Sequence, residues 1–156
     1  MQVDIVDMPS VRVAYMRKIG PYGPQLGEFW RNTFMPWMES AKLTGRPTYG
    51  IGHDDPCVTA PDKCRYDACV EVPDGFTAQG DVSVMTLPGG RYAITRFTGS
   101  PATIGNAWTE FCADWLPKSG FQCDARPCFE YYPASGMTDQ ETGVFSCDLC
   151  IPIRAL

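Results

Sequence analysis

The sequence predicts an α+β fold, an antiparallel eight-stranded sheet with two helices on one face. Three observations support this prediction. The two halves of the chain repeat one another in sequence. Each half carries two tryptophans seven residues apart, which is about two turns of a helix. The segments on either side of these tryptophans alternate between apolar and polar residues, as strands do. The fold therefore follows from a duplicated strand–strand–helix–strand–strand module.

The chain has 156 residues, of which 44% are hydrophobic and 20% charged, as in folded globular proteins. We expect one domain over residues 1–156, built from pseudo-repeats at about 1–73 and 80–156. The segment VPDGFTAQG at 72–80 has the composition of a linker between them.

The second strand of each half gives the best match between the repeats. MPSVRVAYMRKIGP from Met8 aligns with LPGGRYAITRFTGS from Leu87. A preceding strand is expected at 2–6 and at 81–87. Gly89-Gly90 predicts a two-residue hairpin turn, because both glycines can adopt a positive φ. The identical pairs are Arg12 and Arg91, Ala14 and Ala93, Arg17 and Arg96, and Gly20 and Gly99.

A helix follows in each half, expected at 24–43 and at 101–118. Pro36 should kink or split the first helix, because proline supplies no N–H to the helical hydrogen bonds. We expect Trp30, Trp37 and Trp115 to be core residues. Trp108 lies in the first half of its helix and is a candidate pocket ring.

Two further strands complete each half. GRPTYGIG from Gly45 aligns with ARPCFEYY from Ala125, and YDACVEV from Tyr66 aligns with the segment around Asp148. One half alone would leave its sheet face and its helix uncovered, so we expect both halves to share one sheet. The cleft between the halves is a natural place for a ligand.

The net charge of −5 and the pI of about 4.7 argue against several classes of partner. Nucleic-acid binding needs a basic surface, so we expect no nucleic-acid partner, and anionic membrane surfaces are equally disfavoured. The N-terminal segment MQVDIVDMPS has no apolar run. We therefore expect no export signal, and a cytoplasmic protein whose eight cysteines are mostly reduced.

Glu130 is the candidate functional residue, because it lies among aromatic residues in the expected strand RPCFEYYPAS. Alternation along a strand places Tyr132 and Cys128 on the same side as Glu130. Phe129 and Tyr131 then point to the other side, which we expect to lie against the helices.

Two interpretations of Glu130 follow from the residues. In the repeat alignment it matches Gly50, so one half offers a carboxylate where the other leaves space. A carboxylate beside aromatic rings suits an organic cation, which gains both charge pairing and cation–π attraction. Alternatively, Glu130 pairs with an arginine of the protein, which would be Arg126, Arg12 or Arg91.

Six segments taken in order resemble the GyrI-like small-molecule-binding domain, the effector-binding domain of certain AraC-type and MerR-type regulators. They are RVAYMRKIGPYG (12–23), TYGIGHDDP (48–56), YDACVEVP (66–73), GGRYAITRFTG (89–99), CFEYYP (128–133) and CDLCIPI (147–153). The resemblance implies the duplicated fold deduced above. We expect a stand-alone member of the family, since no DNA-binding segment precedes the first expected strand.

The resemblance also implies a site. In multidrug-binding members, a glutamate in the strand after the second helix pairs with lipophilic cations at the base of an aromatic pocket. By its place in CFEYYP that residue is Glu130 here, with Tyr132 as its same-face partner. The resemblance further implies that Tyr22, Trp108 and Phe145 are aromatic residues of the same pocket. We therefore expect multidrug-type binding of amphipathic, cationic small molecules.

Two other functions stay open. Some members of the resembled family are hydrolases that open cyclopropane rings in DNA-alkylating natural products, and Glu130 with Tyr132 would suit acid–base chemistry of that kind. The gyrase inhibitor of the family acts through a protein partner. Whether the chain is an enzyme is thus left open, as is the choice between monomer and homodimer.

We expect no cofactor and no metal. Cys147 and Cys150 are three apart on an alternating strand, so they point to opposite faces and suit neither a shared metal nor a redox pair. His53 is the only histidine, and its spacing to the cysteines after it matches no familiar zinc motif.

Overall fold

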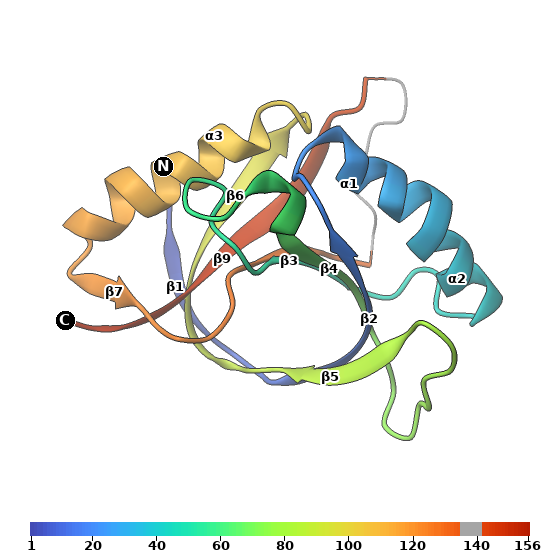
Figure 1. The fold of residues 1–156 in the computed structure, drawn as a ribbon. Helices are drawn as coiled ribbons and strands as arrows, with labels where there is room; N and C mark the ends of the chain where they lie inside the picture. The colour runs from blue at the N-terminus through green and yellow to red at the C-terminus, as the bar shows by residue number, and fades with distance from the viewer. Residues whose placement is uncertain (135–141) are drawn as a thin grey trace.

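The computed structural model describes residues 1–134 and 142–156. Eight strands form an antiparallel sheet in the order β1-β6-β9-β8-β3-β4-β2-β5, and a short strand, β7, pairs with β9. The sheet curls, and two helical segments lie on its outer face (Figure 1). The predicted α+β fold, an eight-stranded antiparallel sheet with two helices, is therefore confirmed.

All eight expected strands are present within a few residues of their predicted bounds. They are β1 (Asp4–Met8), β2 (Val11–Ile19), β3 (Thr48–Gly52), β4 (Arg65–Glu71), β5 (Ser83–Leu87), β6 (Gly90–Gly99), β8 (Phe129–Tyr132) and β9 (Phe145–Ala155). The additional strand β7 (Phe121–Cys123) is absent from the sequence prediction, because three residues are too few to show alternation.

The strand order is symmetric about its centre. β3 and β8 lie in the middle, followed outward by β4 and β9, by β2 and β6, and at the edges by β5 and β1. β1 pairs with β6 and β5 pairs with β2, so each half adds its first strand to the other half's side of the sheet. Neither half therefore completes its share of the sheet without the other.

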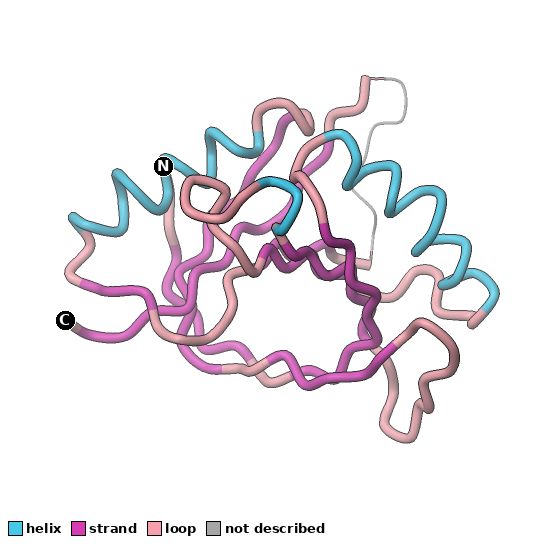
Figure 2. Tube along the Cα trace, in the orientation of Figure 1, coloured by secondary structure: helices cyan, strands magenta, loops and turns pink. Residues whose placement is uncertain are grey.

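The turns β1–β2 and β5–β6 contact each other and bring the two ends of the curled sheet together, as the path of the tube in Figure 2 shows. The Gly89 backbone N–H donates to Ser10 Oγ at 2.9 Å. A Cβ on Gly89 would lie 2.4 Å from the Met8 carbonyl oxygen. Gly90 has the expected positive φ, 121°, but β5 pairs with β2 whereas β6 pairs with β1 and β9, so the predicted hairpin of the two strands is wrong. Gly89 does not have a positive φ. Glycine is needed at this position because the backbone of residues 8–10 leaves no room for a side chain.

The first helix runs continuously as α1 (Pro24–Phe29), a π-helical segment (Trp30–Phe34) and α2 (Met35–Ser40). The second consists of α3 (Ile104–Thr109), a π-helical segment (Glu110–Trp115) and a 3-10 turn (Leu116–Lys118). A further 3-10 turn spans Pro61–Lys63.

A proline follows each π-helical segment at the second residue, Pro36 in the first helix and Pro117 in the second. Because proline donates no N–H, the hydrogen bonding of the helix changes there. The first helix ends at Ser40, before the predicted residue 43, and Lys42 takes a left-handed φ of 61° as the chain leaves it.

Three clusters of buried side chains form the core. Two lie between the sheet's outer face and the helices, one beneath α1 and α2 and one beneath α3. The third fills the inner face and joins Leu87 of β5 to Tyr92 of β6 and Val13 of β2. The sheet is thus buried on both faces, and a polar side chain on its central strands lies in a protein interior.

Candidate functional site

Glu130 lies on β8 at the centre of the sheet. Its cross-strand neighbours are Gly50 of β3 and Leu149 of β9. The residue that the repeat alignment matched with Glu130 is therefore also its direct neighbour in the sheet. The site lies where the two halves meet.

Two neutral side chains hydrogen-bond the Glu130 carboxylate. Trp108 Nε1–H, from α3, donates to Oε2 at 2.9 Å. The Tyr132 hydroxyl, from the same strand, donates to Oε1 at 3.0 Å. The structure thus brings together the three residues that sequence reasoning placed at the centre of the site. Tyr132 lies on the same side of the strand as Glu130, as alternation predicts.

The three arginines considered as partners of Glu130 bind elsewhere. Arg126 pairs with Asp124 at 3.0 Å and donates to the carbonyl oxygen of Gly89. Arg12 donates to the backbone carbonyls of residues 73 and 76. The Arg91 guanidinium lies 5.9 Å from the centre of the Phe121 ring. Among these contacts none neutralises the Glu130 charge.

Burial controls the protonation of the site. It raises the pKa of the Glu130 carboxyl above its ordinary value, although the hydrogen bonds from Trp108 and Tyr132 oppose part of the rise. Burial, and then the charge of Glu130, raises the pKa of both Tyr132 and Tyr66 well above that of a free phenol. Both phenols therefore remain neutral donors at physiological pH.

Gly50 provides the space for this arrangement. A Cβ at this position would lie 2.1 Å from the Tyr66 hydroxyl and 3.2 Å from Glu130 Oε1. The Tyr66 hydroxyl in turn accepts a hydrogen bond from Trp30 Nε1–H at 3.0 Å. The small residue of one half thus makes room for a buried phenol beside the carboxylate of the other.

Trp30 packs against the core cluster beneath α1 and α2, as expected, and its indole also lies beside the candidate site. Its ring lies edge-on to Tyr132 with the centroids 6.2 Å apart. Trp30 and Trp108 are the first tryptophans of the pairs in the two halves. The Trp30 indole N–H donates to the Tyr66 hydroxyl, and the Trp108 indole N–H donates to Glu130. The repeat was the signal for this role, since it matches Trp30 with the candidate ring Trp108.

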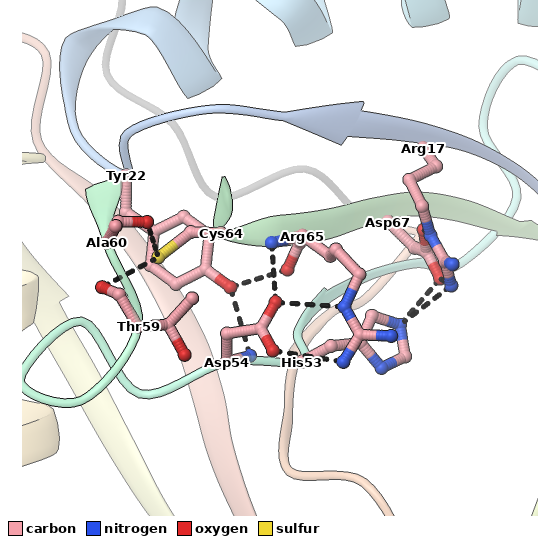
Figure 3. Close-up of polar contacts among 9 residues, drawn as sticks. All are labelled: Arg17, Tyr22, His53, Asp54, Thr59, Ala60, Cys64, Arg65 and Asp67. Carbon is pink, nitrogen blue, oxygen red and sulfur yellow. Dashed lines mark hydrogen bonds and ion pairs between the residues drawn. The ribbon is translucent and has the colours of Figure 1, made fainter. Parts of the chain in front are cut away.

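Phe145 and Tyr22 contact different residues around the carboxylate. The Phe145 ring packs against Tyr132 with centroids 6.2 Å apart. The Tyr22 ring lies edge-on to the Tyr66 ring, with the centroids 6.1 Å apart. Its hydroxyl donates to the Arg65 carbonyl and accepts the Asp54 N–H (Figure 3). Phe145 is thus a wall of the site, and Tyr22 is one layer further out.

The prediction that Phe129 and Tyr131 lie against the helices is wrong. Both pack in the inner-face cluster, where the centroids of their rings lie 5.6 and 5.3 Å from that of Tyr49. Glu130 and Tyr132 are the residues that face the helices. Alternation shows which residues share a face of a strand, but it does not show which face the helices cover.

The inner face carries two charged pairs that sequence reasoning did not single out. Asp67 is fully buried and contacts Arg17 at 2.8 Å and His53 at 2.6 Å (Figure 3). Arg96 and Asp148, their equivalents in the repeat alignment, pair at 2.7 Å. Burial alone would raise the pKa of Asp67, but the hydrogen bonds from His53 and Arg17 hold it below its ordinary value.

Two cavities of the described structure lie away from Glu130. One of about 280 Å³ opens on the inner face and is lined by Met8, Tyr49, Glu71 and Tyr131 among others. Another, of about 690 Å³, lies between the N-terminal residues and α3.

Outside 135–141, no three His, Cys, Asp or Glu side chains are placed to hold a metal ion. No helix in 1–134 or 142–156 has the length and apolar character needed to cross a membrane.

The comparisons agree with this architecture. A DNA gyrase inhibitor of Cronobacter sakazakii (strain ATCC BAA-894) is 30% identical over 157 residues, covering 99% of this chain and 98% of that protein. The C-terminal domain of EcmrR has the same fold, with a TM-score of 0.79, 15% identity and coverage of 99% and 98%. So does SAV2435 bound to tetraphenylphosphonium, with a TM-score of 0.64, 16% identity and coverage of 99% and 94%.

The family model described as the GyrI-like small molecule binding domain matches residues 1–154. This match covers nearly the whole chain and agrees with the fold and with the resemblance found in the sequence. The chain belongs to the GyrI-like small-molecule-binding domain family.

Proposed function

We propose that this chain binds lipophilic organic cations, with Glu130 as the charge anchor. The observation that carries the proposal is a partly buried carboxylate whose hydrogen-bond donors are both neutral, the Trp108 indole and the Tyr132 hydroxyl. A buried carboxylate gains much from a positive partner. The arginines nearest in sequence and sheet are engaged elsewhere, so a cationic ligand would supply that partner.

The surroundings of Glu130 suit a cation with an apolar surface. Trp108 and Tyr132 contact the carboxylate directly, and the rings of Trp30 and Phe145 pack against Tyr132. Each ring face offers a cation about 0.5–2 kcal/mol of attraction. Tetraphenylphosphonium, which is bound in the similar structure of SAV2435, carries no N–H group and depends on charge and ring contacts alone.

Glu130 and Tyr132 belong to the sheet, whereas Trp108 belongs to the helix above it. A ligand that displaces the Trp108 indole to approach the carboxylate breaks its hydrogen bond, which contributes about 1.5–3 kcal/mol because its acceptor is charged. We expect the gain from a full positive charge in this buried site to exceed that loss.

A tryptophan-fluorescence titration tests the proposal with two probes of nearly equal size and opposite charge, tetraphenylphosphonium and tetraphenylborate. We expect a saturable change with the cation alone. Glu130→Gln should weaken cation binding at least tenfold, about 1.4 kcal/mol. Glu71→Gln, on the inner face, is the matched control and should leave the affinity unchanged. Equal cation affinity in Glu130→Gln and in the parent would refute the anchor role.

A second candidate function is hydrolysis of an electrophilic cyclopropane compound. It is favoured by the Tyr132 hydroxyl, which lies 3.0 Å from a carboxylate whose pKa is raised by burial. Mass spectrometry of such a compound after incubation with the protein separates the two functions. A product heavier by one water would establish hydrolysis, and an unchanged compound would favour binding alone.

Protein interaction is tested separately, because a relative 30% identical to this chain is a DNA gyrase inhibitor. Inhibition of purified gyrase in a supercoiling assay without any small molecule would support an interaction role. We also propose a cytoplasmic location, which fits eight cysteines that are all free thiols. Gel filtration with light scattering distinguishes a monomer from a homodimer.

A further inference from the structure

A second carboxylate lies beside aromatic rings, on the inner face of the sheet. The cavity of about 280 Å³ on that face is lined by residues of the central strands β3, β4 and β8 and of the turns β1–β2 and β5–β6. The rings of Tyr49, Phe129 and Tyr131 line it, and Glu71 is the one charged side chain among the described residues around it. Glu130 faces the helices on the other side of the sheet. The cavity is therefore separate from the Glu130 site.

The Glu71 carboxylate can accept further hydrogen bonds. Its Oε2 accepts the Tyr49 hydroxyl at 3.4 Å, which is long for a hydrogen bond between oxygens. Within 1–134 and 142–156, Oε1 accepts no hydrogen bond and the carboxylate forms no ion pair. The Arg46 Nε–H donates to the Glu71 backbone carbonyl at 2.6 Å, and not to the carboxylate. A cation that enters the cavity would supply the charged donor that the carboxylate lacks.

The aromatic side chains form one continuous surface next to this carboxylate. Tyr49 and Tyr131 are cross-strand neighbours, and their ring centroids lie 5.3 Å apart. The Phe129 ring centroid lies 5.6 Å from that of Tyr49. Burial, and then the charge of Glu71, raises the pKa of the Tyr49 hydroxyl, which therefore stays a neutral donor. An aromatic ligand can pack on these rings while its charged end reaches Glu71.

The volume of the cavity limits the size of that ligand. Ordinary ligand pockets have volumes of about 300–1,000 Å³, so a cavity of about 280 Å³ suits a molecule with a single aromatic ring. Tetraphenylphosphonium has four rings around its charge and no N–H group. It does not suit this cavity, and Glu71 remains a control residue for that probe.

We propose that the inner-face cavity is a second ligand site, which binds a protonated amine with one aromatic ring on a short chain. The ammonium N–H groups donate to the Glu71 carboxylate, and the ring packs against Tyr49, Phe129 and Tyr131. Charge-assisted hydrogen bonds of this kind are stronger than those between neutral groups, so the site selects the ammonium ion over a neutral analogue. The proposal does not depend on the function proposed for Glu130.

An NMR titration of the isotope-labelled chain tests the proposal with phenethylammonium and with phenethyl alcohol, which has the same ring and chain but no charge. With the ammonium ion we expect saturable shifts in the backbone N–H signals of Met8 and Leu87, which line the cavity. The indole N–H signal of Trp108, which donates to Glu130, should not move. The alcohol should bind at least tenfold more weakly. Equal affinities for the two probes, or no binding of the ammonium ion, would overturn the proposal.

Variants locate the charge that the ammonium ion recognises. Glu71→Gln should weaken the binding of phenethylammonium at least tenfold. Glu39→Gln, on the exposed side of α2, is the matched control and should leave that affinity unchanged. A loss of affinity in Glu130→Gln with none in Glu71→Gln would place the probe at the other site and overturn the proposal. The comparison of the two probes in the parent decides the question even where Glu71→Gln fails to fold.

Discussion

Gly50→Ala tests whether the packing around position 50, where the two halves meet, is as close as the structure shows. The added methyl group would lie 2.1 Å from the Tyr66 hydroxyl, 3.0 Å from Tyr66 Cζ and 3.2 Å from Glu130 Oε1. Tyr66 is buried, and its hydroxyl accepts the Trp30 indole N–H. The phenol therefore cannot move without giving up that bond or its packing.

Overpacking a well-filled interior by one methyl group costs about 1–3 kcal/mol. The shortest contact here is far below van der Waals distance, which places Gly50→Ala toward the upper part of that range. For a chain of this size each kcal/mol corresponds to about 2–4 °C in Tm. We expect a fall of several degrees, with weaker cation binding because Glu130 Oε1 is displaced as well.

Urea unfolding followed by far-UV circular dichroism measures the change, and a double-mutant cycle with Tyr66→Phe identifies its cause. Removing the hydroxyl removes the 2.1 Å contact, so Gly50→Ala should cost at least about 1 kcal/mol less in the Tyr66→Phe background. Gly105→Ala is the control, because nothing lies within 4 Å of its added Cβ. In the helix α3 it should stabilise the fold by up to about 1 kcal/mol.

An unfolding free energy for Gly50→Ala equal to that of the parent would refute the reasoning. So would a cost that is the same with and without the Tyr66 hydroxyl. Either result would mean that the sheet relaxes around position 50 without disturbing the site.

Three further predictions follow from the buried acids. Cation affinity should fall as the pH is lowered through the raised pKa of Glu130, because a protonated carboxyl carries no charge; pH-independent binding, measured by titration, would contradict this. Glu130→Gln should not lower the Tm at pH 7, because a raised pKa in the folded state means that stability from this group is present below its unfolded pKa of about 4.3 and is lost as the pH rises through the folded value. Asp67→Asn should cost about 1–3 kcal/mol in urea unfolding at pH 7. Because the pKa of Asp67 is lowered, its contribution is present above about pH 3.9 and is lost as the pH falls through the folded value; an equal cost at pH 7 and at pH 2 would argue against the ion pairs with Arg17 and His53.

The repeat made the fold predictable, because each strand and helix could be predicted from its pattern in both halves of the chain. It also placed Glu130 opposite Gly50, and this pair is adjacent in the sheet. Which strands pair with one another was harder to predict from the sequence. That β1 pairs with β6 depends on contacts between distant segments, which leave no pattern within either strand.

Trp30 shows why the site was only partly predictable. A tryptophan on the buried side of a helix shows the same spacing whether it fills the core or lines a site. What distinguishes Trp30 is its indole N–H, which donates to the buried Tyr66 hydroxyl. Such a bond depends on three-dimensional contact between a helix and a strand 36 residues away.

The exchange of β1 and β5 between the halves has a consequence for the chain as a whole. Cleavage of the segment at 72–80 would not release two independent units, because each fragment would still hold an edge strand that completes the other's sheet. The cut protein should behave as an intertwined heterodimer, in which neither fragment folds until it meets its complement. A single polypeptide here is organised as two mutually dependent subunits joined by a tether.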